Sequence, residues 1–435
     1  MKLGNPTEGG DPGRPTGVGD SGRSGSRTAF IAPLVATLGL LAITVGSVYG
    51  ITLLAVPGAP GVDASNQPGA SGGPFATPHI GPNKTPNPTL IITPPPAERP
   101  TFSGTILFTR AGDIWAANGA NLTQLTTKGT DSAPAWSPDG SKIYFIQTTE
   151  KSTDPPWSGS HYTFYYPSIM SMNADGSNRA QIYNGLFKSG SGSWFSTILT
   201  PDVSPNGKTI VVASDGQYVP NNNNVQDFSP VVLYTVPAAG GKLQNMNVRN
   251  SNGLGHNDPA WSPDGTRLAF TFNGKNGATG APRIGILSVG TKQLTLLKKG
   301  YANPSWSPDM HYIAAELTQG NGPDVVVLDP ATGAEVARLT NDGNSFNPVF
   351  SPNGDQIAYL KRNGLSVDLR VMTLDLTSGI TLSSDKPITD DGALAADSAP
   401  AWFIPQSERT TPATGPSPAG SSAAPAESTT PSTSP

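Results

Sequence analysis

Between residues 101 and 405, short apolar segments alternate with turn sequences rich in Gly, Asp, Asn and Pro. One series of segments reads KIYFIQ, TIVVAS, RLAFTF, YIAAEL and QIAYLK, and a second series follows it with SIMSMN, VVLYTV, RIGILSV, DVVVLD and LRVMTLD. Short apolar runs bounded by turn residues are typical of β-strands, and the helical spacing of apolar residues is missing from this region. The pattern predicts an all-β domain over 101–405.

A motif of Pro, an aromatic residue, Ser-Pro and Asp-Gly precedes these strands and repeats along the domain. It reads PAWSPDG at 134–140 and 259–265, PSWSPDM at 304–310, PVFSPNG at 348–354 and, in a weaker copy, PDVSPNG at 201–207. From Trp261 to Trp306 to Phe350 the spacing is 45 and 44 residues. A repeat of this length with four short strands is that of a β-propeller blade.

The motif is interpreted as a folding device. Asp-Gly supplies the positive φ angles of a tight hairpin, Ser-Pro leads into the turn, and the aromatic ring packs between blades. The motif's Asp139, Asp264 and Asp309 are therefore interpreted as turn formers and not as catalytic groups or metal ligands.

The two ends of the domain complement each other. Residues 104–125 supply three strands of a blade without a preceding motif, whereas 399–404 supply an innermost strand that lacks Ser-Pro-Asp-Gly. We expect 399–404 to complete the first blade, which closes a ring of six blades and removes its free edges.

Copies of P-x-W-S-P-D-G followed by an apolar strand resemble the repeats of TolB-type, WD40-like β-propellers, over about 104–405. Such repeats occur in the periplasmic propeller protein of the Tol system and in prolyl-oligopeptidase-like enzymes. The resemblance implies the fold but no single function. Where the Tol protein has an α/β domain, this chain has an apolar segment and a Pro-rich spacer, and no α/β-hydrolase domain is predicted after residue 405.

Residues 29–56 contain no charged side chain and are long enough to span a bilayer as a helix. Arg14, Arg23 and Arg27 precede this segment, and the next basic residue after it is Lys84. This bias predicts a single-pass signal anchor in contact with membrane lipid, with a cytoplasmic N-terminus and an extracytoplasmic propeller. A cleaved signal peptide is the alternative, but its apolar region would be about half as long.

The other segments outside the domain are too polar or too rich in Pro and Gly to form a core. Residues 1–28 are predicted to be a disordered cytoplasmic segment, and 57–100 an extended Pro-rich linker. Residues 406–435 are predicted to be a disordered Ser/Thr/Pro tail.

Composition excludes several classes of function. The chain has 27 Lys and Arg against 31 Asp and Glu, without a basic stripe, so no nucleic-acid partner is expected. The absence of Cys excludes disulfides and thiolate chemistry. The four His have no metal-ligand spacing, and no nucleophile elbow, phosphate loop or zinc-protease motif is found. No catalytic residue and no metal ligand is therefore assigned.

Aromatic insertions in the second and third blades form the first candidate site. Segments 148–167 and 215–230 are expected to be loops between the second and third strands, and 184–198 the loop that joins the two blades. Antiparallel strand order places all three on one face. The candidate binding residues are Trp157, Tyr162, Tyr165, Tyr166, Trp194 and Tyr218. Such rings suit protein, peptide or glycan surfaces, and mutual packing of the loops is the alternative.

The second candidate site is the mouth of the central channel. Thr200, Asp258, Asn303 and Asn347 stand before the prolines of the innermost strands and would meet there. Their oxygens can hold a cation such as calcium, the one cofactor considered. The favoured interpretation is that they cap the starts of the strands.

Together these features favour a non-catalytic, membrane-tethered propeller that binds an extracytoplasmic protein, peptide or wall polymer through aromatic loops of blades 2 and 3. The alternative is a propeller enzyme, a carbohydrate lyase or hydrolase, acting in the central channel. That activity requires a group of acids, bases or metal ligands in the channel, whereas PAWS, PSWS and PVFS of the inner strands are small and mostly apolar.

Overall fold

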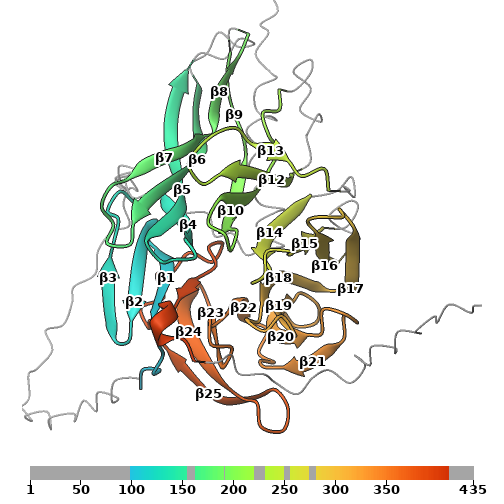
Figure 1. Ribbon diagram of the computed structural model, residues 1–435. Coiled ribbons are helices and arrows are strands. Elements are labelled where there is room, and N and C mark those ends of the chain that lie inside the picture. The colour runs from blue at the N-terminus through green and yellow to red at the C-terminus, as the bar shows by residue number, and fades with distance from the viewer. Residues whose placement is uncertain are drawn as a thin grey trace, which may run out of the picture. The chain divides into compact units, whose positions relative to one another are not determined.

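The computed structural model describes residues 98–153, 162–190, 192–219, 231–248, 255–273 and 281–410. Six four-stranded antiparallel sheets are arranged around a central axis (Figure 1). The described residues contain one helix, the short 3-10 helix η1 (Gln406–Glu408). The prediction of an all-β, six-bladed propeller is confirmed.

The blades are numbered along the chain, and their strands are given from the channel outward. Blade 1 contains β26 (Ala401–Phe403), β1 (Thr105–Arg110), β2 (Asp113–Asn118) and β3 (Asn121–Gln124). Blade 2 contains β4 (Asp131–Trp136), β5 (Lys142–Thr153), β6 (Tyr162–Asn173) and β7 (Ala180–Asn184). Blade 3 contains β10 (Ile198–Val203), β11 (Thr209–Ser214), β12 (Val232–Pro237) and β13 (Gln244–Asn245).

Blade 4 contains β14 (His256–Trp261), β15 (Arg267–Phe272), β16 (Arg283–Ser288) and β17 (Leu294–Lys299). Blade 5 contains β18 (Tyr301–Trp306), β19 (Ile313–Leu317), β20 (Asp324–Leu328) and β21 (Glu335–Arg338). Blade 6 contains β22 (Ser345–Phe350), β23 (Gln356–Asn363), β24 (Ser366–Asp375) and β25 (Thr381–Pro387). A separate two-stranded sheet pairs β8 (Leu186–Ser189) with β9 (Gly192–Phe195).

The repeated motif forms the turn between the first two strands of a blade. In blade 2 the Ser137 hydroxyl donates to Asp139 Oδ1 at 2.6 Å and accepts from the Lys142 N–H at 2.9 Å. Gly140 has a φ of 70°, which favours glycine. The Ser137 hydrogen bond is the main reason why the pKa of Asp139 is lowered. The Asp139 carboxylate therefore stabilises its own turn through hydrogen bonds, as the sequence predicted.

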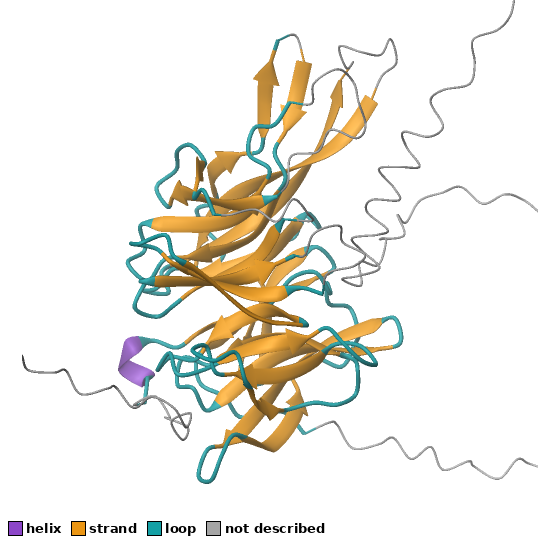
Figure 2. Ribbon diagram, turned by 90° about the vertical axis from the view of Figure 1, so that its right-hand side faces the viewer, coloured by secondary structure: helices purple, strands orange, loops and turns teal. Residues whose placement is uncertain are grey.

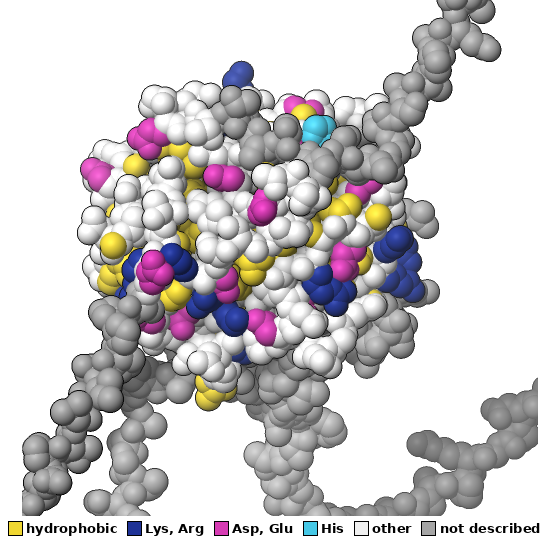
Figure 3. Space-filling view, turned by 90° about the horizontal axis from the view of Figure 1, so that it is seen from below, with side chains coloured by type: hydrophobic (Ala, Val, Ile, Leu, Met, Phe, Trp, Pro, Cys, Tyr) yellow, Lys and Arg dark blue, Asp and Glu magenta, His cyan; other side chains and the backbone are white. Residues whose placement is uncertain are grey.

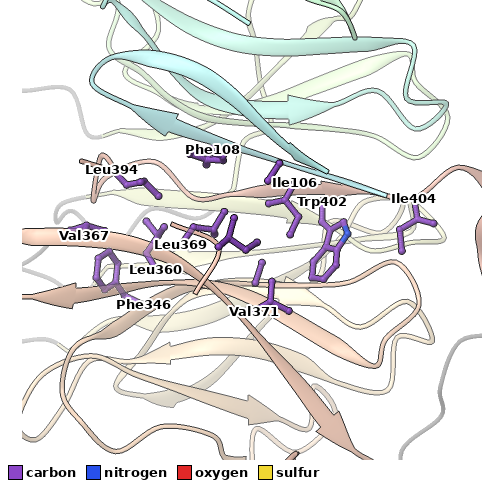
Figure 4. Packing of buried hydrophobic residues seen from close by; sticks show 13 residues of the cluster. Ile106, Phe108, Phe346, Leu360, Val367, Leu369, Val371, Leu394, Trp402 and Ile404 are labelled. Atoms are coloured by element: carbon purple, nitrogen blue, oxygen red, sulfur yellow. The ribbon is translucent and has the colours of Figure 1, made fainter. Parts of the chain in front are cut away.

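The ring is closed by its two chain ends. β26 pairs with β1 in the register Ile106↔Trp402, so the expected closure by the last strand is confirmed. Trp402 Nε1 donates to the Ser103 carbonyl at 2.9 Å. Figure 4 shows Trp402 and Ile404 facing apolar side chains of blade 6 such as Val371. Apolar clusters of this kind lie between neighbouring blades and supply most of the burial.

The predicted membrane span, 29–56, lies outside the described residues, as do 1–28, 57–97 and 411–435. Within the part of the chain that the structure describes, no helix has the length and apolar character needed to cross a bilayer.

The side of the propeller seen in Figure 3 carries interspersed basic and acidic side chains.

Candidate functional site

Insertions 148–167 and 184–198 are mostly strands where the structure describes them, so the prediction of loops is wrong there. The described part of the third insertion, 215–219, is a loop, as predicted. β5 and β6 pair continuously up to Thr153↔Tyr162, well beyond the other two strands of blade 2. The predicted connecting loop 184–198 contains the hairpin of β8 and β9. Thr, Phe and Tyr favour extended strands, and cross-strand pairing together with the Phe164–Phe195 contact holds them in this conformation. We call the outer part of β5–β6 (148–153 and 162–167) and β8–β9 the paired hairpins.

The paired hairpins hold each other through aromatic contacts. Phe164 and Phe195 stack with ring centroids 5.3 Å apart, and Phe164 also contacts Tyr166 at 6.4 Å. Phe164 is buried, whereas its neighbour Tyr165 points to the opposite face of the ribbon and is 61% exposed. Some rings therefore pack the hairpins, and at least one is presented to solvent. Both hairpins project beyond the blades (Figures 1 and 2).

The remaining candidate rings differ in their surroundings. Trp194 is half-buried, and its Nε1 donates to the Ser189 carbonyl at 3.3 Å across the β8–β9 hairpin. Tyr166 and Tyr218 are also half-buried. The side chain of Tyr162 and all of Trp157 lie outside the described residues.

The second candidate site is a central cavity of about 410 Å³ lined by all six innermost strands. Thr200, Asp258, Asn303 and Asn347 all line it, so the structure brings the four predicted mouth residues together. Each stands at a β-bulge, where the innermost strand shifts register against the next strand. Their φ angles are 39°, 49°, 50° and 52°, an uncommon conformation for residues other than glycine. Bulges re-aim side chains, here in the strand segments that line the channel.

A chain of hydrogen bonds links the mouth residues across blades 3 to 6. The Asp258 N–H donates to Thr200 Oγ1 at 3.2 Å, and the Asn303 N–H donates to Thr271 Oγ1 at 2.9 Å. Asn303 Nδ2 donates to Asn347 Oδ1 at 2.7 Å. These bonds join neighbouring blades at the mouth and give the four residues a structural role.

Two acidic residues of the channel region were missed by sequence reasoning. Glu316 accepts from Asn303 Nδ2 at 2.6 Å, and burial raises its pKa to about 7, with a smaller contribution from Asp258. Asp202 accepts from the Trp261 N–H at 2.7 Å, and burial raises its pKa, like that of Asp258, to about 6. The signal for Glu316 was a charged residue inside the apolar strand YIAAEL.

No group of three or more His, Cys, Asp or Glu suited to a metal ion occurs in the described ranges. The carboxyl groups of the channel region can exchange protons, and the carboxyl and amide groups can bind a polar group by hydrogen bonds.

Comparison with known proteins identifies the repeats. The model of the TolB beta propeller domain, PD40, matches residues 168–402. This chain belongs to that family. A protein of Chlorobium luteolum named Protein TolB homolog is 29% identical over 178 residues, which cover 40% of this chain and 37% of the relative. The Tol-Pal system protein TolB of Francisella tularensis subsp. mediasiatica is 37% identical over 78 residues, 18% of each chain. This TolB-type propeller thus spans well under half of these relatives.

The solved structures that resemble this chain have low sequence identity to it. TolB from Acinetobacter baumannii is 22% identical with a TM-score of 0.48, and the alignment covers 70% of this chain and 68% of that one. A chain of the nidogen/laminin complex is 12% identical with a TM-score of 0.45, over 68% of this chain and 97% of that one.

Proposed function

We propose that this TolB-type propeller is a non-catalytic binding protein that recognises another protein through the paired hairpins. The observation that carries this proposal is that the hairpins extend outside the blade packing and expose Tyr165. Phe195 of β9, which stacks on Phe164, is 41% exposed. Exposed aromatic and apolar side chains grouped on a projecting element are typical of protein-binding sites, where Tyr and Trp dominate the binding energy.

The class of partner is inferred from the relatives. Several of them are named as the TolB protein of the Tol-Pal system. We take this name to indicate that they act together with other proteins. We propose the same kind of role here, with a protein and not a glycan or lipid as the partner of the hairpins. In this proposal the apolar segment 29–56 anchors the chain and the propeller is extracytoplasmic.

Shortening the first hairpin should abolish partner binding and leave the fold intact. The variant removes 149–166 and joins Thr148 to Pro167, which are paired in the ladder, through an Asn-Gly turn. The rest of β5–β6 stays within blade 2, so thermal unfolding should remain cooperative. Binding is measured by photocrosslinking in native envelopes, with p-benzoylphenylalanine replacing Tyr165 of the full chain.

The matched control places the same photocrosslinker at Leu382, which is 43% exposed on the outer strand of blade 6. We expect one discrete adduct from position 165 and none from 382. Unlabelled wild-type chain should compete for the adduct, and the shortened variant should not. Equal adducts from both positions, or full competition by the shortened variant, would contradict the proposal.

The buried acids of the channel favour one second candidate, the channel enzyme. A carboxyl with a pKa of about 7 beside one of about 6 is a pair that can act as general acid and base near neutral pH. Against catalysis, Glu316 is 9% exposed and hydrogen-bonded to Asn303. Reducing-end release from polygalacturonate or xylan tests this candidate: the binding proposal expects none, whereas release abolished by Glu316→Gln would establish the enzyme.

A further inference from the structure

The channel is not six-fold symmetric at the end where the Asp-Gly turns lie, which we call the turn end. In five blades the aromatic position of the innermost strand, or Val203 in blade 3, is followed by Ser-Pro, but in blade 1 Trp402 is followed by Phe403 and Ile404. Phe403 lines the cavity and contacts Trp136 of blade 2 with ring centroids 5.4 Å apart. A side chain at Gly140 would collide with the Phe403 ring, so this ring is tightly held against blade 2.

The chain then returns to the channel after its last strand. Following η1, Arg409 lines the same cavity, and its guanidinium carbon lies 5.8 Å from the Phe403 ring centroid. Arg409 Nε donates to the Ile404 carbonyl at 2.8 Å. The next residue is fixed to blade 6, because the Thr410 N–H donates to Asn353 Oδ1 at 3.2 Å. The guanidinium is therefore positioned by two anchors on neighbouring blades.

Arg409 forms no ion pair with another described residue, although Asp202, Asp258 and Asp397 also line the cavity. It is the one Lys or Arg among the described residues that line the cavity. Burial lowers the pKa of Arg409, and no carboxylate of the described chain contributes to that shift. The Arg409 Nε donates to the Ile404 carbonyl, so the two terminal nitrogens of the guanidinium remain as donors for a ligand. Partial burial of a guanidinium without an opposite charge costs free energy, and a bound anion would offset that cost.

We propose that the turn end of the channel is a carboxylate-binding subsite in which Arg409 holds the carboxylate and Phe403 and Trp136 hold an adjoining apolar group. Guanidinium binds carboxylate through two parallel hydrogen bonds, and flat rings provide the apolar wall. The carboxylate has two possible sources. One is the chain's own tail, which continues from Thr410 and contains Glu427. The other is a separate peptide.

The test uses 3-phenylpropionate as the probe and its uncharged amide as the comparison. The full chain is labelled with 5-fluorotryptophan, whose seven fluorine signals are observed by NMR, and Trp136 is assigned with Trp136→Phe. We expect a saturable shift of the Trp136 signal with the acid and none with the amide. Arg409→Gln should weaken binding of the acid roughly tenfold or more, because a hydrogen bond to a charged group is lost, and Arg409→Lys should restore part of it.

The matched control is Arg267→Gln. The Arg267 guanidinium also lies over a tryptophan ring, 4.5 Å from the Trp306 centroid, but it does not line the cavity. This variant should bind the probe like the wild type. Undiminished binding by a folded Arg409→Gln variant, with its fluorine signals still dispersed, overturns the proposal, as does an equal shift with the amide.

A chain ending at Thr410 distinguishes the two sources. Tighter probe binding after truncation means that the tail occupies the subsite in the full chain. Unchanged binding means that the subsite receives a separate carboxylate. Both outcomes require Arg409, so each supports the subsite and names its occupant.

Discussion

Replacing Trp402 with alanine should lower the free energy of unfolding by about 3–5 kcal/mol, the usual cost of emptying a large aromatic site in a core. Trp402 is 8% exposed, packs edge-on against Phe102 at 5.8 Å and donates to the Ser103 carbonyl. It stands on β26, the short strand that joins the two ends of the chain. Urea unfolding of the full chain, followed by circular dichroism, measures the loss.

The control is Trp194→Ala. Trp194 is half-buried on the β8–β9 hairpin, outside the six blades, so its removal should cost about 1 kcal/mol or less. Similar losses for the two variants would mean that closure of the ring through β26 contributes little to stability. That result would contradict a stabilising role for the packing between blades 1 and 6 (Figure 4).

The ring itself was predictable because several weak signals agree. The motif fixes where each innermost strand ends, since Pro restricts φ and Asp-Gly allows the positive φ angles that the turn requires. The surplus strand at 399–404 and the incomplete blade at 104–125 then leave one closed arrangement. Blade number, strand order and closure follow from these local constraints without knowledge of side-chain packing.

The details of the candidate sites were less predictable because they depend on contacts between distant residues. The described parts of the predicted loop 148–167 are strands that pair with each other and are held by the stacking of Phe164 on Phe195. The bulges at Thr200 and its equivalents precede proline, where positive φ is not the local preference. Arg409 lies in a segment whose composition indicates a solvated tail, and only its contacts with Ile404 and the Phe403 ring place it in the channel.

The stability of the protein should depend on pH through Glu316. Burial raises the pKa of this carboxyl from 4.5 to about 7, so between these values the folded protein keeps a proton that the unfolded chain has lost. The contribution of Glu316 is therefore fully present below about pH 4.5 and is lost as pH rises through 7. The groups facing it are Asp258, which raises its pKa, and Asn303, Asn347 and Arg362, which lower it. The expected loss is about 2–4 kcal/mol.

Glu316→Gln should remove this dependence, because glutamine still accepts the Asn303 hydrogen bond but carries no charge at any pH. The difference in unfolding free energy between variant and wild type, measured from pH 5 to 8, should favour the variant increasingly as the pH rises. Glu335→Gln is the control, because Glu335 lies on the outer strand of the same blade and pairs with Arg338 at the surface. A difference that stays flat across this range would mean that Glu316 is ionised in the fold at pH 5, and that the channel accommodates its charge without cost.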